Sequence, residues 1–263
     1  MINEMNSYCL CGLALGKKYR SCAVNVARDM EKYHPGIQYL ILTDEPRDFQ
    51  DSSNVIAIKH IQDSIMFPYN DRRFAIEKAL ERYDMTIQID TDIRLIKPLG
   101  FPEQFNNLDG VFGTIKNLKA HLTRYQPENV PYYEKVAQKL DIDFENAPYV
   151  GEFIFAVGKN RKKEEEFIYY WGIIAKYLEI HRLHGADGPV MGLAAAKAGL
   201  PTYPSEWSHI IEREFVEHLK FSSGKNTIQK SDWEKLKFRV AYHYRLNKQR
   251  ILALKDFNFY YSD

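Results

Sequence analysis

The sequence has few cysteines and no long apolar stretch. Its three cysteines, Cys9, Cys11 and Cys22, are too few for a disulfide framework, so we expect reduced thiols in a cytoplasmic protein. Cys9 and Cys11 share one face of a predicted strand, but no second Cys/His cluster has zinc spacing, which favours buried core thiols. The first seven residues are polar, and we expect no secretory signal. The longest weakly polar run, residues 190–196, is too short to span a bilayer.

An excess of either charge is also missing from the chain as a whole. Lys plus Arg number 36 and Asp plus Glu 35, a net charge of +1, which argues against a dedicated nucleic-acid binder. The charge is nevertheless uneven, because residues 220–263 hold ten Lys/Arg against four Asp/Glu. Such a segment suits an anionic ligand, a phosphate or a membrane surface, or is simply a solvated helix and tail. We expect at most peripheral membrane contact.

What is present is an ordinary globular composition, with 45% hydrophobic and 27% charged residues. A length of 263 residues is near the upper limit for one hydrophobic core. The sequence contains no linker or break in composition, so we expect one domain over residues 1–263.

Strand-like and helix-like segments alternate through the first half. Short apolar runs at 8–15, 37–43, 54–59 and 85–89 predict strands, and apolar residues at helical spacing predict helices over 19–33 and 76–83. This order predicts an α/β fold with a mainly parallel central sheet covered by helices. The second half predicts strands at 110–114, 149–157 and 238–244 and helices at 132–140, 161–180 and 189–199.

The strongest chemical signal is a pair of carboxylates, Asp90 and Asp92, directly after the strand at 85–89. Ligands collect at the carboxyl ends of parallel strands, so this is where chemistry is expected. Two carboxylates separated by one residue converge on a hard divalent cation such as Mg²⁺ or Mn²⁺, while the side chain between them points away. The alternative is a polar strand-to-loop junction, where Asp is common.

Residues 71–80, the strand at 85–89 and Asp90-Thr91-Asp92 together resemble nucleotide-sugar glycosyltransferases of the GT-A fold, nearest to glycosyltransferase family 8-type enzymes. The resemblance covers most of the chain, with its specificity in residues 71–92. It implies a single-domain GT-A fold with a nucleotide-binding half at about 1–115 and an acceptor-side half at about 116–263. It also implies a hexosyltransferase in which Mn²⁺ (or Mg²⁺) on Asp90 and Asp92 holds the diphosphate of a UDP-linked sugar donor. The acceptor would be a glycan or glycolipid.

The same resemblance implies further donor-site residues. Those assigned to the nucleotide or its diphosphate are Ala14, Leu15, Tyr19, Asp44, Arg73, Thr91, Arg245 and Lys248. His243, in the run 240–244, resembles the family's third metal ligand, although a histidine satisfied in the core is the alternative.

On the acceptor side the resemblance singles out Glu152 and Asp187. Either carboxylate would deprotonate the acceptor hydroxyl or stabilise the oxocarbenium-like centre. The alternatives are that Glu152 lies at a wet end of the sheet and that Asp187 only caps a helix. Gly188 stands where the family usually has Gln, which leaves the donor class and the stereochemical outcome open.

Three other function classes compete with a glycosyltransferase. A sugar-nucleotide nucleotidyltransferase would need a glycine-rich basic loop near the N-terminus, and the segment from Gly12 to Gly16 is poor in glycine. A phosphohydrolase would carry its Asp pair after the first strand. The presence of Gly188 where the family usually has Gln favours a non-catalytic sugar-binding protein with a degenerate site.

Overall fold

The computed structural model describes residues 7–185, 187–219 and 231–262, and the alternation expected for the first half is present. The order β1-α1-β2-β3-α2-β4 matches the predicted sequence of strands and helices. The strands are β1 (Tyr8–Ala14), β2 (Tyr39–Thr43), β3 (Val55–Lys59), β4 (Met85–Ile89), β5 (Ile93–Leu95), β6 (Val111–Asn117), β7 (Pro148–Gly158), β8 (Thr202–Pro204) and β9 (Val216–His218). The helices are α1 (Lys17–Tyr33), α2 (Arg72–Leu80), α3 (Leu118–Tyr125), α4 (Val130–Lys139), α5 (Lys163–Ile180), α6 (Gly188–Ala198), α7 (Trp207–Glu214), α8 (Asp232–Ala253) and α9 (Phe257–Tyr261). Short 3₁₀ turns lie at Pro46–Phe49, Pro68–Asp71, Glu103–Asn107, Pro127–Asn129 and Leu254–Asp256.

Seven strands form one central sheet in the order β3-β2-β1-β4-β7-β6-β8. β1 pairs in parallel with both β2 and β4, whereas β7 runs antiparallel to its neighbours β4 and β6. The expected α/β fold with a mainly parallel sheet flanked by helices is therefore confirmed. Because the chain turns from β3 back across β1 to β4, the carboxyl ends of β1 and β4 form a crevice where ligands bind in such sheets.

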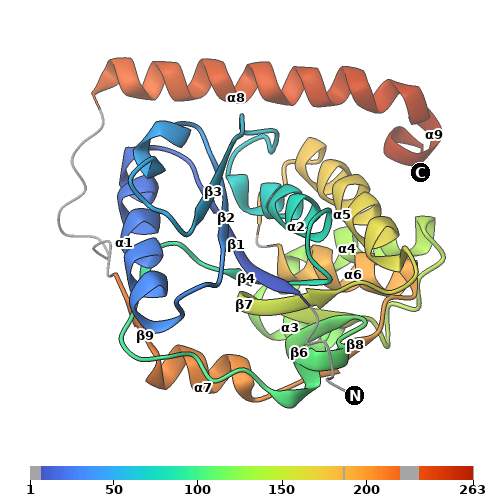
Figure 1. The fold of residues 1–263 in the computed structure, drawn as a ribbon. Coiled ribbons are helices and arrows are strands. Elements are labelled where there is room, and N and C mark those ends of the chain that lie inside the picture. The colour runs from blue at the N-terminus through green and yellow to red at the C-terminus, as the bar shows by residue number, and fades with distance from the viewer. Residues whose placement is uncertain (1–6, 186, 220–230, 263) are drawn as a thin grey trace.

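The sheet has an apolar core on each face, and the side chains of β1 alternate between them. Cys9 and Cys11 face one cluster, which contains α2, α5 and α6, whereas Leu10 faces the other with α1 and α7. Both cysteines are fully buried, as expected, and burial raises the pKa of Cys9 to about 12. Figure 1 shows α1 and α2 on either side of the strands. Because helices cover both faces of the sheet, a ligand can reach the strands at their carboxyl ends.

The prediction of a strand at 238–244 is wrong, because these residues lie within the 22-residue helix α8. The helix begins with a capping box in which the Ser231 side chain accepts a hydrogen bond from Glu234 N and the Glu234 side chain accepts one from Ser231 N. α8 runs along the upper side of the molecule in Figure 1. Among the described residues, no helix has both the length and the apolar character needed to cross a bilayer.

Candidate functional site

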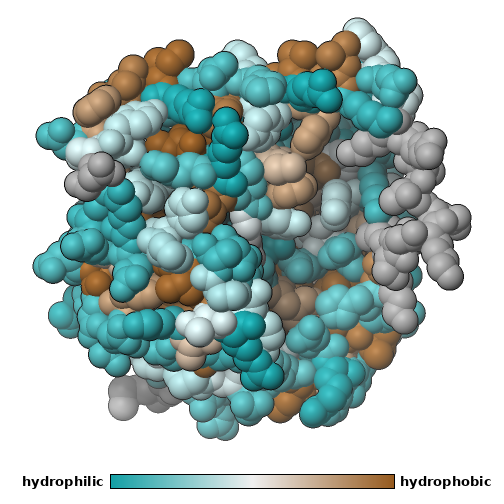
Figure 2. Space-filling view, turned by 180° about the vertical axis from the view of Figure 1, so that it is seen from behind, coloured by the Kyte–Doolittle hydropathy of each residue, from teal (hydrophilic) through white to brown (hydrophobic). Residues whose placement is uncertain are grey.

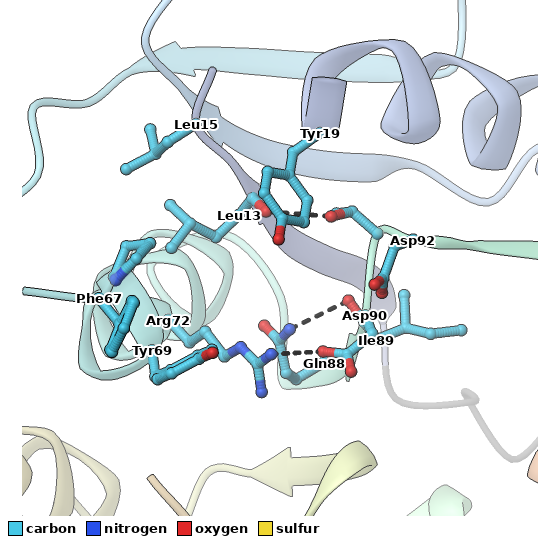
Figure 3. Close-up of a pocket in the computed structure, with 12 residues that line it drawn as sticks. Leu13, Leu15, Tyr19, Phe67, Tyr69, Arg72, Gln88, Ile89, Asp90 and Asp92 are labelled. Atoms are coloured by element: carbon cyan, nitrogen blue, oxygen red, sulfur yellow. Dashed lines mark hydrogen bonds and ion pairs between the residues drawn. The ribbon is translucent and has the colours of Figure 1, made fainter. Parts of the chain in front are cut away.

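A cleft of about 290 Å³ lies at the carboxyl ends of β1 and β4. Its residues come from the end of β1 and the start of α1, from the turn before α2, and from the end of β4; they are Leu13, Leu15, Tyr19, Phe67, Pro68, Tyr69, Arg72, Gln88, Ile89, Asp90, Thr91 and Asp92. In Figure 3, Tyr19 and Leu15 lie on one side of the cleft, Phe67 and Tyr69 on another, and the two aspartates close it. Of the six nucleotide-site residues expected from the first half, the cleft contains Leu15, Tyr19 and Thr91, and Ala14 is buried next to Leu15.

Backbone and side-chain hydrogen bonds hold the Asp90-Thr91-Asp92 segment in place. Asp90 N donates to Phe153 O of β7 at 3.2 Å, and Leu219 N, just after β9, donates to Asp92 O at 2.9 Å. Thr91 Oγ1 lies 3.3 Å from Leu13 O, so the middle side chain turns away toward β1. The segment follows β4, the fourth strand along the chain, and this position differs from the one a phosphohydrolase would need.

Arg72, at the start of α2, is the cation of this site. Its Nη2 lies 2.5 Å from Asp90 Oδ1, and its Nη1 donates to Glu152 O at 3.1 Å and lies 3.5 Å from Asp187 Oδ2. Its side chain is 14% exposed. Burial opposes the charged form, but the carboxylates around it outweigh burial and raise the pKa of the Arg72 guanidinium. One guanidinium therefore joins Asp90 at the end of β4 to the carboxyl of Asp187 and to the backbone carbonyl of Glu152.

Glu152 and Asp187 form a carboxyl pair in which Asp187 is buried and Glu152 is half-buried. Asp187 precedes α6 and is 0% exposed, and its side chain does not cap the helix, so the capping alternative is not observed. Glu152 Oε1 accepts a hydrogen bond from Gly188 N at 3.0 Å. Burial, together with the charge of Glu152, raises the pKa of Asp187 to about 7 in spite of Arg72, and burial also raises the pKa of Glu152. Asp187 Oδ1 receives no hydrogen bond from any described donor, and a proton on either residue would join the two carboxyls.

Gly188 is required by close packing against β7. A Cβ atom at this position would lie 2.5 Å from Tyr149 Cε2 and 2.6 Å from Val150 O. A Gln at position 188 would therefore not fit without moving the strand that carries Glu152. The Glu152 carboxyl accepts a hydrogen bond from Gly188 N, so it does not lie free at a solvent-exposed end of the sheet. Glycine in place of the family's Gln at position 188 allows this short contact between α6 and β7.

Carboxylates outnumber cations in the cleft, which is the electrostatic condition that favours a divalent cation. Burial raises the pKa of Asp90 to about 6; Arg72 opposes that shift, and the nearby Asp92 and Asp187 add to it. No group of three or more His, Cys, Asp or Glu side chains within the described ranges is arranged to hold a metal. Asp90 and Asp92 are the two carboxylates of the cleft that could hold a cation such as Mg²⁺ or Mn²⁺, because such ions keep waters and take further oxygens from a substrate phosphate.

Three cations assigned to the diphosphate from sequence, Arg73, Arg245 and Lys248, do not line the cleft. Arg73 Nη1 donates to Asn70 O at 2.7 Å, Arg245 Nε donates to Ile65 O at 2.9 Å, and Lys248 Nζ lies 3.6 Å from Asp63 Oδ1. All three partners belong to the segment before α2. These cations hold the loop that carries Phe67 and Tyr69, and the cation in the cleft is Arg72.

His243 and Asp44 also lie outside the cleft lining, as do Ala14, Glu152 and Asp187. His243 is on α8 and lines a separate cavity with Met66 and Tyr242, because the run that carries it is a helix. Asp44, at the end of β2, accepts hydrogen bonds from Gly16 N at 3.0 Å and from Arg20 Nη1 at 2.8 Å. Although burial opposes this, those bonds lower the pKa of Asp44. Its observed contacts are to the backbone and side chain at the start of α1.

A different histidine, His218, lies beside the aspartates. It pairs with Ile93 in the two-stranded sheet of β5 and β9, and its positive charge when protonated would lower the pKa of Asp90. Sequence reasoning missed both His218 and Arg72. His218 was missed because β9 has only three residues, which is too short to show the alternation of a strand. Arg72 was missed because Arg73 stands next to it, and the sequence does not show which of the two faces the cleft.

No known protein family matches this sequence, and no curated protein matches it. Among solved structures, one similar chain is the apo structure of WbbM, a bifunctional glycosyltransferase, with a TM-score of 0.47 and 10% sequence identity. The match covers 76% of this chain and 39% of the WbbM chain, so this protein spans well under half of that protein's length.

Proposed function

We propose that this protein is a metal-dependent glycosyltransferase that moves a sugar from a nucleotide-sugar donor, a UDP-sugar, to a hydroxyl of a glycan or glycolipid. The observation that carries the proposal is the juxtaposition, through Arg72, of two kinds of carboxylates. Asp90 and Asp92 lie at the end of β4, and the buried Asp187, paired with the half-buried Glu152, contacts the other nitrogen of the same guanidinium. The first pair suits a metal-bound diphosphate and the second suits an acceptor hydroxyl.

The donor would bind with its diphosphate toward Asp90 and Asp92. A divalent cation held there supplies Lewis-acid chemistry, which neutralises the charge that collects on the departing nucleoside diphosphate. The apolar and aromatic part of the cleft, from Leu15, Tyr19 and Phe67, offers faces on which a base and ribose pack. UDP is taken from the family resemblance, because these contacts contain no base-specific reader.

Arg72 has two roles in this proposal. Its fixed positive charge lies beside the position of the diphosphate, where it favours the accumulation of negative charge. Its second nitrogen, near Asp187, keeps that carboxyl in reach of the same centre. A guanidinium is suited to this bridging because its planar fork presents several donors in fixed directions.

Asp187 and Glu152 would handle the proton of the acceptor. A general base works best with a pKa near the working pH, and Asp187 has a pKa raised to about 7. Asp187 Oδ1 is buried and has no described hydrogen-bond donor, so it is the oxygen of this pair that is left to hold a proton. Glu152, held by Gly188 N, would keep the shared proton between the two carboxyls. The reduced, buried cysteines suit a reaction in the cytoplasm.

The proposal is tested by binding of UDP and UDP-sugars with and without Mn²⁺, followed by calorimetry or thermal shift. We expect Mn²⁺ to strengthen nucleotide binding in the native protein, and Asp92→Asn to remove that effect. Asp51→Asn, at an exposed turn away from the cleft, is the matched control and should bind as the native protein does. Nucleotide binding that is identical in Asp92→Asn and the native protein, with and without Mn²⁺, would contradict the metal-bridged site.

A further inference from the structure

Helix α8 has one face packed on the protein. Leu246, Gln249 and Ala253 are buried, and Gln249 Nε2 donates to Asp63 Oδ1 at 2.9 Å. Arg245, on the same side, donates to Ile65 O. These contacts explain why the helix lies against the segment that precedes α2; they come from residues 245–253, whereas residues 232–240 are all exposed.

The opposite face of α8 is also apolar, and it is exposed. We define the outer stripe as Trp233, Val240, Tyr244, Ile251 and Leu254, the last of which lies just after the helix. Their exposed fractions are 62%, 61%, 70%, 66% and 56%. At about 100° per residue, Trp233, Tyr244 and Ile251 fall within about 20° of one line, which is roughly opposite the buried Leu246 and Ala253. Figure 2 shows brown side chains among teal ones along the upper edge of the molecule, where α8 runs.

The charges around Val240, Tyr244 and Ile251 of the outer stripe are of one sign, whereas Trp233 stands between Asp232 and Glu234 and Asp256 follows Leu254 closely. Between residues 235 and 255 the sequence has seven Lys/Arg and no Asp or Glu. On the helix, Lys237 and Lys248 flank one side of the stripe, and Lys248 also lies 3.6 Å from Asp63 Oδ1. Arg239 and Arg250 lie about 100° or more to the other side, between the stripe and the packed face. Lys237 Nζ lies 5.2 Å from the centre of the Trp233 ring, so the aromatic and basic groups are interleaved.

This charge pattern distinguishes two surfaces that could cover the outer stripe, namely a second copy of α8 and a lipid membrane. A second copy packed on Val240, Tyr244 and Ile251 would bring two sets of cations together, because residues 235–255 hold no Asp or Glu, and like charges across a helix pair disfavour association. An anionic lipid surface offers the complementary charge, and an exposed apolar stripe with Trp and Tyr beside Lys and Arg is the pattern of helices that lie in the membrane interface.

We propose that α8 docks this protein on anionic lipid membranes, with the outer stripe inserted at the level of the headgroups and the flanking cations bound to lipid phosphates. A helix of 22 residues would lie along the surface for about 33 Å. Met66 lies beneath α8, and the next residue, Phe67, lines the cleft. If the proposed glycosyl transfer holds, docking therefore brings the cleft near the surface where a lipid-linked acceptor would be met.

The test is co-sedimentation of the full-length protein with vesicles of neutral phosphatidylcholine and with vesicles that also contain phosphatidylglycerol. We expect binding to the anionic vesicles that weakens as salt is raised, and little binding to the neutral ones. The double variant Tyr244→Ser with Ile251→Ser should lower the partition coefficient roughly tenfold or more, because it removes two inserted apolar side chains. The Lys237→Glu with Arg250→Glu variant should lose the dependence on anionic lipid.

The matched control is Tyr125→Ser with Ile210→Ser, which makes the same chemical changes at exposed residues of α3 and α7. It should bind vesicles as the native protein does, and the thermal midpoint of each variant reports whether it is folded. Equal binding to neutral and anionic vesicles, or equal loss in the control, would overturn the proposal. So would sedimentation equilibrium showing a native dimer that Tyr244→Ser with Ile251→Ser converts to a monomer, without vesicle binding by either. Vesicle binding is read without donor or acceptor, so it stands apart from the outcome of the nucleotide test.

Discussion

Arg72 Nη2 lies 2.5 Å from Asp90 Oδ1, and this ion pair joins the first turn of α2 to the end of β4 inside the cleft. The next residue along the helix, Arg73, points elsewhere and lies with its guanidinium carbon 3.9 Å from the Phe74 ring centre. Two adjacent arginines thus have separate tasks. One faces the ligand cleft and the other holds the loop that forms the cleft wall.

The first prediction separates these two arginines. Arg72→Lys should raise the Kd for a Mn²⁺-dependent nucleotide about tenfold or more, because an ammonium group cannot bridge Asp90 and Asp187 as the guanidinium does. Arg73→Lys should leave that Kd unchanged and lower the thermal midpoint instead. Isothermal titration of both variants measures the difference. A larger loss of nucleotide affinity in Arg73→Lys would reverse the assignment.

The second prediction concerns the proton shared by Asp187 and Glu152. If Asp187 must be ionised to accept the proton, kcat/KM should rise with pH through about 7, the raised pKa of Asp187. Glu152→Gln removes a like charge, so it should lower the pKa of Asp187 and move the rise to lower pH. Asp187→Asn should remove the rise together with most of the activity. A pH profile of Glu152→Gln that coincides with that of the native enzyme would contradict the coupling.

The third prediction concerns the stability of the loop before α2. Glu179 on α5 is buried, and its carboxyl accepts hydrogen bonds from Ile65 N at 2.7 Å and Asn70 Nδ2 at 3.1 Å. Burial raises its pKa from 4.5 to about 7, so the folded state favours the protonated acid. The stability from this group is fully present below about pH 4.5 and is lost as pH rises through 7, by on the order of 3 kcal/mol.

Glu179→Gln keeps a hydrogen-bonding side chain of the same shape without the ionisation. The free energy of unfolding of Glu179→Gln, measured with urea, should increase relative to that of the native protein as pH rises from about 4.5 to about 7. Glu128→Gln, at an exposed position, is the control and should track the native protein at every pH. A constant difference between native protein and Glu179→Gln over the whole range would argue that Glu179 is ionised throughout.

The fourth prediction tests the contact between α6 and β7. Gly188→Ala should destabilise the fold by about 1–3 kcal/mol, because its Cβ would overlap Tyr149 and Val150. Gly100→Ala is the matched control, because a Cβ there would meet nothing within 4 Å, and it should leave the thermal midpoint nearly unchanged. Equal midpoints in the two variants would show that α6 can move away from β7 at little cost.

The first half of the fold could be read from the sequence because its signals are local. Short apolar runs and a helical stripe between turn residues define β1, α1, β2 and β4 without reference to the rest of the chain. The run at 238–244 was misread because its aromatic and β-branched residues suit a strand, and a helix that is apolar on two sides shows no single stripe. The Ser231 and Glu234 capping box was the local signal that a helix begins there.

The sequence alone determined where the carboxylates of the candidate site stand, since Asp90 and Asp92 follow a buried strand directly and must lie at its end. Only the tertiary structure decided which other side chains meet them. One step along a helix turns a side chain by about 100°, so the choice of Arg72 over Arg73 depends on how α2 packs on the sheet. Glu152, Asp187 and His218 lie far along the chain from Asp90 and approach it only because β7, α6 and β9 close around β4. Distances between segments so remote in sequence are set by the packing of the whole fold, which no local pattern contains.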